Sequence, residues 1–254
     1  MAIIIKTKEQ IEKLRVAGKI HAEILKKLEA FAEPGMSTKD LDREAERLVR
    51  MMGAEPAFLA YRPEPTYPPY PASLCVSVNQ VVVHGIPSEE EILKEGDIVS
   101  IDFGVKYQGV YTDAARTFFL ANVSQKAKQL IFDTYEALDH GIAAAQLGNT
   151  IGDIGYAVES FNHGRYGNVR ELAGHGVGVE IHEDPYVPNY GKPGQGAVLR
   201  EGMVLAIEPM FTLGSSAVHF HDDFYTVSTS DGSLSAHVED TILITKDGPE
   251  ILTR

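Results

Sequence analysis

Four acidic side chains interrupt segments of the chain that are otherwise apolar, and this pattern is typical of a metal site. The four are Asp102, Asp113, Glu208 and Glu239. A charge within a buried strand is costly unless it is paired or bound to a cation, and carboxylates are the usual oxygen ligands of hard divalent metals. We therefore predict a shared cation site. For each residue taken alone, the alternative is a solvated surface carboxylate.

Two of these carboxylates belong to one predicted hairpin. A two-residue turn at Tyr107-Gln108 would pair Lys106 with Gly109 and would place Asp102 directly opposite Asp113 on one side of the sheet. Their Cβ atoms would then lie about 4.5–5.5 Å apart, and a bound cation would offset their mutual repulsion. The alternatives are a different turn register or a solvated hairpin.

Three histidines lie in segments that could serve the same chemistry. His175 lies between Gly174 and Gly176, which would let the backbone approach a ligand closely. A neutral imidazole is a common metal ligand, although a lone histidine is more often a core or surface residue. We expect Asn79 to help hold the loop that carries His84. The third histidine, His182, follows the glycine-rich segment.

The predicted ligand set contains one imidazole and four carboxylates, which is more than one ion needs. It suits two divalent ions about 3.5–4 Å apart, joined by bridging carboxylates and a hydroxide. Such a pair hydrolyses amides or esters, and His84 and His182 would donate to the carbonyl oxygen or the amide nitrogen. The predicted ligands are Asp102, Asp113, His175, Glu208 and Glu239.

The elements that must position these residues follow from hydrophobic periodicity and from capping signals. A loop at residues 62–71, with five prolines, is predicted to lack regular structure. The predicted helices cover residues 7–32, 124–147 and 150–161, with another that begins at Ser37 and stops at Gly53. The predicted strands cover residues 75–78, 81–83, 98–101, 110–120, 203–207, 224–228 and 238–245.

The second half of the chain repeats the order of the first. The segment that begins at Gly35 matches the one at Gly148, and Glu95–Asp102 matches Glu201–Glu208. The second match superimposes one carboxylate on another. We predict a single catalytic domain, residues 1–254, built from pseudo-symmetric halves of approximately 1–120 and 121–254, with the site between them. Chance similarity of two apolar strands is the alternative.

Composition narrows the class of protein. The chain has 254 residues, a net charge of −13 and one cysteine, which excludes a disulfide framework and a cysteine-rich zinc site. The acidic balance argues against binding nucleic acid. The apolar segments are too short for a signal peptide or a membrane helix, so we expect a cytoplasmic protein.

The motifs together resemble the methionine aminopeptidases, in their short, bacterial-like type I form. The resemblance rests on Asn79 with His84-Gly-Ile-Pro87, on Asp102 with Asp113, on Gly174-His-Gly with His182-Glu-Asp-Pro, on Ile207-Glu-Pro, and on Glu239-Asp-Thr. It implies an α/β (α+β) pita-bread fold, with helix–helix–strand halves around a curved antiparallel sheet.

The resemblance also implies a role for each site residue. Asp102 would chelate one ion, and Asp113 and Glu239 would bridge both. His175 and Glu208 would complete the shell of the other ion. The substrate-binding and catalytic histidines would be His84 and His182, which would contact the scissile amide.

The implied activity is removal of the initiator methionine from nascent proteins when the second residue is small. The implied cofactors are two divalent ions per chain, Co, Mn, Fe or Zn. The implied partners are N-terminal peptides and, transiently, the ribosome; we expect a monomer that binds neither nucleic acid nor membrane. Two alternatives are kept: an Xaa-Pro aminopeptidase or dipeptidase of the same fold, and a non-catalytic peptide-binding relative.

Three features depart from the family pattern and bear on side-chain specificity. The loop at residues 62–71 is several residues longer than expected and should lie near the pocket mouth. Tyr225 stands where tryptophan is usual, whereas Phe58, Tyr61 and Cys75 match other wall positions. Asp240 follows Glu239, where the methionine enzymes usually have histidine and the proline-specific relatives have aspartate.

Overall fold

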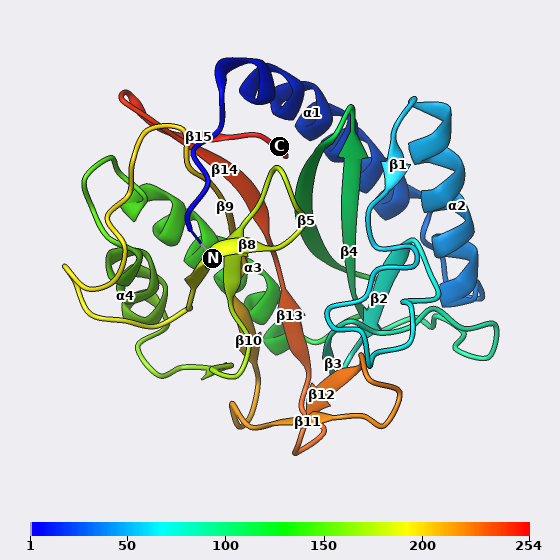
Figure 1. The fold of residues 1–254 in the computed structure, drawn as a ribbon. Coiled ribbons are helices and arrows are strands. Elements are labelled where there is room, and N and C mark those ends of the chain that lie inside the picture. Colours follow the sequence, from blue (N-terminus) through cyan, green and yellow to red (C-terminus); the bar gives the residue numbers. More distant parts are fainter. Residues whose placement is uncertain (1) are drawn as a thin grey trace.

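The helices begin where the capping signals predict. The computed structural model describes residues 2–254, and its elements are labelled in Figure 1. Thr7 caps α1 through a capping box with Gln10, and Ser124 caps α3 through a bond from the Ala127 N–H. These side chains bond the free N–H groups of the first turn. The helices are α1 (Lys8–Phe31), α2 (Thr38–Met51), α3 (Gln125–Ala144) and α4 (Ile151–Asn162).

Two larger sheets carry the structure, one from each half of the chain. In the first, β4 (Ile98–Tyr107) lies between β1 (Glu55–Pro56) and β2 (Leu74–Val78), and it also pairs with β5 (Val110–Phe119). The second sheet has the order β15-β14-β9-β7-β8. Its strands are β7 (Gly174–Gly176), β8 (Glu183–Val187), β9 (Val204–Ile207), β14 (Asp240–Thr245) and β15 (Gly248–Ile251).

Two small antiparallel sheets complete the structure, and the one that contains β3 joins strands from the two halves. One has the order β13-β10-β6 and the other the order β11-β12-β3. Their strands are β3 (Val81–Val83), β6 (Gly167–Asn168), β10 (Met210–Thr212), β11 (Val218–Phe220), β12 (Val227–Thr229) and β13 (Ser235–His237).

The β4–β5 hairpin corrects the predicted register. Tyr107 pairs with Val110, so the turn residues are Gln108 and Gly109 rather than Tyr107 and Gln108. Both turn residues have positive φ, 47° and 82°, as a type I′ turn requires and as glycine readily adopts. Asp102 therefore pairs with Ala115 and not with Asp113. The shift is two residues, so both aspartates still lie on the same side of the sheet.

The internal repeat is visible in equivalent contacts of the two halves. The Asp40 carboxylate accepts bonds from the N–H and hydroxyl of Ser37 at the start of α2. Asp153 does the same for Thr150 at the start of α4. Each of these capping residues also forms a β-bridge, Ser37 with Ile92 and Thr150 with Val198. The two helix–helix–strand units are thus built in the same way.

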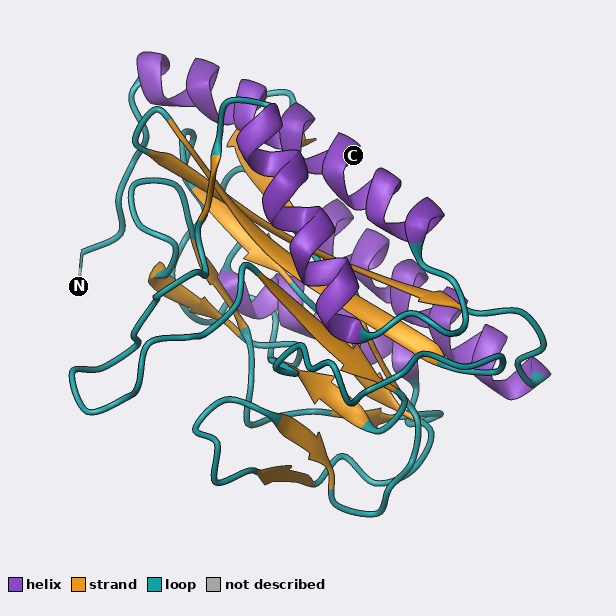
Figure 2. Cartoon of the chain, turned by 90° about the vertical axis from the view of Figure 1, so that its right-hand side faces the viewer, coloured by secondary structure: helices purple, strands orange, loops and turns teal. Residues whose placement is uncertain are grey.

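The helices cover one side of the strands, and most of the loops gather on the other, as Figure 2 shows. Each half has a core between its helices and its sheet. The first half's core includes Leu28, Leu41, Leu48, Ile101 and Phe103. The second half's core includes Leu138, Ile142, Ile154, Leu205 and Ile207. Burying these faces is the main favourable contribution to folding, and it leaves the opposite side of the strands free for a site.

Of two segments outside the larger sheets, the proline-rich loop agrees with the prediction and the predicted strand at 224–228 agrees only in part. Residues 62–71 contain no helix or strand. The predicted strand at 224–228 is wrong at its start, because residues 221–226 form a turn and β12 begins at Val227. Among residues 2–254, no helix combines the length and the apolar character needed to cross a membrane.

Candidate metal centre and pocket

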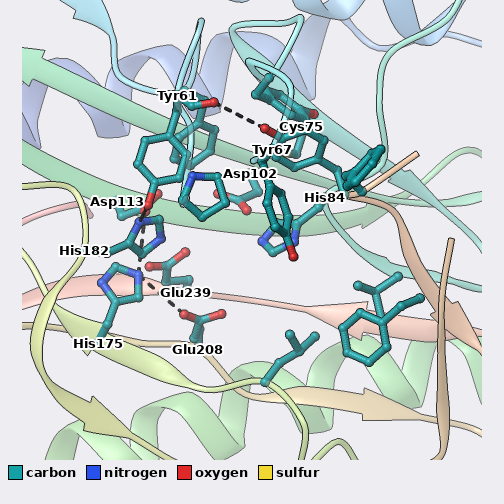
Figure 3. Close-up of a pocket in the computed structure, with 18 residues that line it drawn as sticks. Tyr61, Tyr67, Cys75, His84, Asp102, Asp113, His175, His182, Glu208 and Glu239 are labelled. Carbon is teal, nitrogen blue, oxygen red and sulfur yellow. Dashed lines mark hydrogen bonds and ion pairs between the residues drawn. The ribbon is translucent and has the colours of Figure 1, made fainter. Parts of the chain in front are cut away.

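The five predicted ligands converge on the side of the strands that the helices leave free (Figure 3). Ligand atoms of Asp102, Asp113 and Glu239 lie within 4.8 Å of one another, and so do those of His175, Glu208 and Glu239. Glu239 belongs to both groups. The structure therefore brings together residues that lie up to 137 positions apart in the chain.

Strand pairing accounts for this convergence. Asp102 lies within β4 and Asp113 within β5. Glu208 directly follows β9, and Glu239 directly precedes β14. Because Ile207 pairs with Asp240, Glu208 and Glu239 are the next residues along two neighbouring strands. Each half of the chain thus supplies two carboxylates from a pair of neighbouring strands.

Backbone contacts join the two halves at the level of these ligands. Ala115 and Glu239 exchange backbone hydrogen bonds in both directions, at 3.3 and 3.0 Å. The Thr241 hydroxyl accepts a bond from the Asp113 N–H and donates one to the Asp113 carbonyl. We call this set of contacts between Asp113, Ala115, Glu239 and Thr241 the seam.

Without a bound cation, the negative charges of the four carboxylates would repel one another. Burial raises the pKa of Asp102 and of Glu208 to about 7. Burial, reinforced by neighbouring carboxylates, raises the pKa values of Asp113 and Glu239 well above their usual range. Carboxylates held close together in a poorly hydrated site favour protonation unless a cation binds.

The unpaired oxygens of the cluster test whether a divalent cation fits. Among residues 2–254, Asp102 Oδ1, Asp113 Oδ1 and Glu239 Oε1 are buried and have no hydrogen-bond partner. Buried polar atoms are normally bonded. Three orphaned carboxylate oxygens beside an imidazole form a donor set that suits hard or borderline divalent metals. The residues present therefore fit such ions.

The glycines beside His175 allow its strand to pack closely. A Cβ on Gly174 would lie 2.3 Å from the Ala206 carbonyl oxygen, and one on Gly176 would lie 2.3 Å from that of Asp184. His175 Nδ1 lies 2.9 Å from the Gly176 carbonyl oxygen. When Nδ1–H donates there, Nε2 is left free to ligate. That Nε2 lies 3.7 Å from Glu208 Oε1.

The other two histidines line the same pocket from opposite parts of the chain. His84 follows β3 and has a positive φ of 58°, and burial lowers its pKa to about 4. His182 Nδ1 lies 2.8 Å from the Tyr61 hydroxyl, and its ring lies 4.4 Å from the ring of His175. Burial, with His175 and His84 nearby, lowers the pKa of His182 well below its usual value.

Asn79 lies in the turn between β2 and β3, and β3 is the strand that leads to His84. The Asn79 carboxamide accepts a bond from the Ile98 N–H and donates one to Asp97. The Asn79 backbone carbonyl accepts bonds from the Ser235 N–H and hydroxyl. Asn79 thus ties the turn between β2 and β3 to both halves of the chain.

An apolar cavity of about 360 Å³ opens beside the carboxylates. Phe58, Tyr70 and Cys75 form a buried cluster on its wall, and Tyr61 and Tyr225 pack against that cluster. Ligand pockets typically combine such apolar walls with a few convergent polar groups. This pocket is therefore suited to one apolar side chain placed next to the predicted ligands.

Two contacts were not predicted from the sequence. His237, at the end of β13, is buried with its Nε2 3.2 Å from Glu208 Oε2. Its position two residues before Glu239 was the available signal, because alternate residues of an extended segment share a side. Tyr61 was expected on the pocket wall, but its bond to His182 was not.

The Asp240 side chain does not line the pocket. Its carboxylate is fully buried and pairs with Arg116 at 2.8 Å and with Arg254 at 2.5 Å. It also accepts a bond from the Thr253 hydroxyl. The side chain is therefore committed to a network with the C-terminal segment.

Comparisons with known proteins agree with this geometry. A family model described as metallopeptidase family M24 matches residues 12–246. A methionine aminopeptidase of Clostridium acetobutylicum is 48% identical over 255 residues, covering 99% of this chain and 98% of that protein. Methionine aminopeptidase 1 of Bacillus subtilis is 44% identical over 253 residues, covering 99% of each.

Solved structures of related proteins have the same fold. The crystal structure of methionine aminopeptidase from Rickettsia prowazekii superimposes with a TM-score of 0.95 at 40% identity and covers 100% of both chains. Prolidase from Pyrococcus furiosus superimposes less well, with a TM-score of 0.77 at 27% identity, covering 99% of this chain and 65% of that one.

Proposed function

The chain belongs to metallopeptidase family M24, and from this premise we propose that its buried carboxylates hold two divalent cations beside a pocket for an N-terminal methionine. It is a metal-dependent aminopeptidase of the methionine aminopeptidase type, which removes N-terminal methionine from peptides. The observation that carries the proposal is the group of orphaned carboxylate oxygens beside an apolar cavity.

We assign the ligands from their grouping. Asp102 would hold one cation, and His175 with Glu208 would hold the other. Glu239, which belongs to both groups, would bridge the two, together with Asp113. When bound, divalent cations activate water for attack on an amide and polarise its carbonyl oxygen. His237 Nε2 lies 3.2 Å from Glu208 Oε2 but forms no hydrogen bond there, so it would contact Glu208 without fixing its orientation.

His182 would donate to the substrate through Nε2. When the Tyr61 hydroxyl donates to Nδ1, the single proton of the neutral ring lies on Nε2. An N–H so placed can donate to the carbonyl oxygen of the scissile amide as negative charge develops on it. The hydrogen bond from Tyr61 would therefore select the tautomer that the reaction needs.

His84 would act from the other wall of the pocket. Its backbone is held by its neighbours, because the Tyr70 hydroxyl donates to the carbonyl oxygen of Gly85 at 3.1 Å. The Gly85 N–H in turn donates to the Ser77 hydroxyl at 3.2 Å. A histidine in a fixed, unusual backbone conformation at the pocket is suited to orienting the amide nitrogen of the substrate.

The apolar walls of the pocket indicate which side chain the enzyme prefers at the first position of the substrate. The cluster of Phe58, Tyr70 and Cys75 offers an apolar surface that an unbranched thioether can fill. We further propose that the natural substrates are nascent chains with a small second residue, because the second residue would lie between His84 and His182.

The test pairs metal analysis with peptide hydrolysis. Protein freed of metal would be titrated with Mn²⁺, Co²⁺, Fe²⁺ or Zn²⁺ and assayed on Met-Ala-Ser, Met-Leu-Ser and Ala-Pro-Ala. We expect two ions per chain and fastest cleavage of Met-Ala-Ser. Glu208→Gln should lose metal and activity, whereas Asp247→Asn, at an exposed carboxylate, should retain both. Faster cleavage of Ala-Pro-Ala, or metal binding without cleavage of any peptide, would overturn the proposal.

A further inference from the structure

The pocket has an apolar rim that the proposed reaction does not use. Pro63, Tyr67, Phe220 and Phe224 all line the cavity. Phe220 and Phe224 are 56% exposed, and Pro63 is also exposed. Residues that line a cavity and also face solvent lie at its opening. Exposed apolar patches of this kind often mark interaction sites.

The rim lies on the path that a peptide substrate of an aminopeptidase must take, and this inference rests on the proposed function. The first residue of the substrate must lie inside, next to the buried carboxylates. Those carboxylates close the floor, since Asp102, Asp113 and Glu239 are buried. The rest of the peptide can therefore leave only through the opening, and it must pass the rim.

Phe224 is held outward by its own backbone. Its φ is +74°, a value that is unusual for a bulky residue and costs conformational energy. The turn is maintained by the Asp223 carboxylate, which accepts bonds from the N–H groups of Tyr225 at 2.9 Å and Thr226 at 2.8 Å. A strained turn therefore displays a large aromatic ring to solvent at the pocket mouth.

Tyr67 completes the rim from the long proline-rich loop. Its ring lies 5.6 Å from that of Phe224 and 6.1 Å from that of Tyr225. Figure 3 shows the Tyr67 side chain among those that line the pocket, on the side opposite His175. The Tyr225 hydroxyl donates to the carbonyl oxygens of Tyr61 and Pro68, at the two ends of this part of the loop. The loop is thus fixed to the turn that carries Phe224.

We propose that Phe224 and Tyr67 bind the substrate downstream of the cleaved bond and favour peptides with an apolar third residue. Counted from the N-terminal methionine, the third residue of the peptide would be the first one outside the space between His84 and His182. An apolar side chain there would cover aromatic surface that is otherwise exposed to water, and this would lower KM more than it changes kcat.

The test compares Met-Ala-Leu-Ser with Met-Ala-Ser-Ser, and includes the dipeptide Met-Ala. We expect the parent to prefer the leucine peptide, by about 5-fold in kcat/KM for one partly buried apolar side chain. Phe224→Asn, in which asparagine tolerates the positive φ, should bring the ratio close to one. Its Tm should equal or exceed that of the parent, because strain is relieved. Phe132→Asn is the matched control, since Phe132 is also 56% exposed but lies on α3.

Tyr67→Ser provides a second variant and should also reduce the leucine preference. A parent that cleaves Met-Ala but treats both tetrapeptides alike would overturn this inference and leave the proposed function standing. So would a leucine preference that persists in both Phe224→Asn and Tyr67→Ser. A parent that cleaves none of the three peptides would overturn the proposed function, and this inference with it.

Discussion

A buried ion pair between Lys6 and Glu183 supports the loop that carries His182, and its removal should be costly. Lys6 Nζ lies 2.5 Å from Glu183 Oε2, and the two side chains are only 1% and 3% exposed. Glu183 Oε1 accepts bonds from the N–H groups of Val179 and Glu180, at 2.5 and 3.0 Å. One carboxylate therefore joins the N-terminal segment to both ends of a tight loop.

The expected magnitude follows from this burial. Lys6→Met would leave a buried carboxylate without its counter-charge, and loss of one partner of a buried pair costs about 3–5 kcal/mol. Total stabilities are about 5–15 kcal/mol, so the loss is large. Adding Glu183→Gln should recover most of it, because the amide oxygen can still accept from Val179 and Glu180 while the charge is gone.

Urea denaturation of the parent, the single variant and the double variant would measure these differences. Lys13→Met is the control: its ion pair with Glu9 is exposed, so it should change stability by less than about 0.5 kcal/mol. Since the loop positions His182, Lys6→Met should also lower kcat under conditions in which it is fully folded. A Lys6→Met variant within about 1 kcal/mol of the parent would refute the reasoning.

Asp113→Ala and Glu239→Ala should each lower metal content, measured by elemental analysis, and abolish turnover of Met-Ala-Ser; full metal with retained activity would refute the bridging role. His84→Ala should keep its metal but lower kcat by about 10²–10⁴-fold, and an unchanged kcat would make His84 purely structural. Burial raises the pKa of Asp102 and Glu208 to about 7. In the metal-free protein these two carboxyl groups therefore lose their protons less readily in the folded state than in the unfolded state. The unfolding free energy of the metal-free protein should therefore fall as pH rises through about 7, whereas below about pH 6.5 the lowered pKa of buried histidines such as His84 opposes this fall. Urea titrations in chelator at pH 6.5 and 7.5 check this, and equal or greater stability at pH 7.5 would contradict it.

Local signals in the sequence were sufficient where one side chain decides the structure. The capping pairs Thr7 with Gln10 and Ser37 with Asp40 start α1 and α2 as predicted. The register of the β4–β5 hairpin was not predictable in the same way, because several two-residue turns fit Tyr107-Gln-Gly109. What distinguishes them is the tolerance of Gly109 for positive φ.

The candidate site was predictable in its composition but not in its supporting contacts. Acidic residues within apolar runs stand out, because burying them unpaired is unfavourable. The bond from Tyr61 to His182 and the approach of His237 to Glu208 depend on how distant segments pack. Short strands such as β7 and β13 have too few residues for a periodic pattern.

The seam has a consequence for ion choice. Backbone hydrogen bonds at Ala115 and Glu239, together with the Thr241 hydroxyl on Asp113, anchor carboxylates of both halves at the main chain. The distance between those carboxylates can then change only through side-chain rotation, and not through sliding of one half past the other. Such a cage should discriminate by ionic radius, so that cations as large as Ca²⁺ are excluded even though carboxylate oxygens alone would accept them.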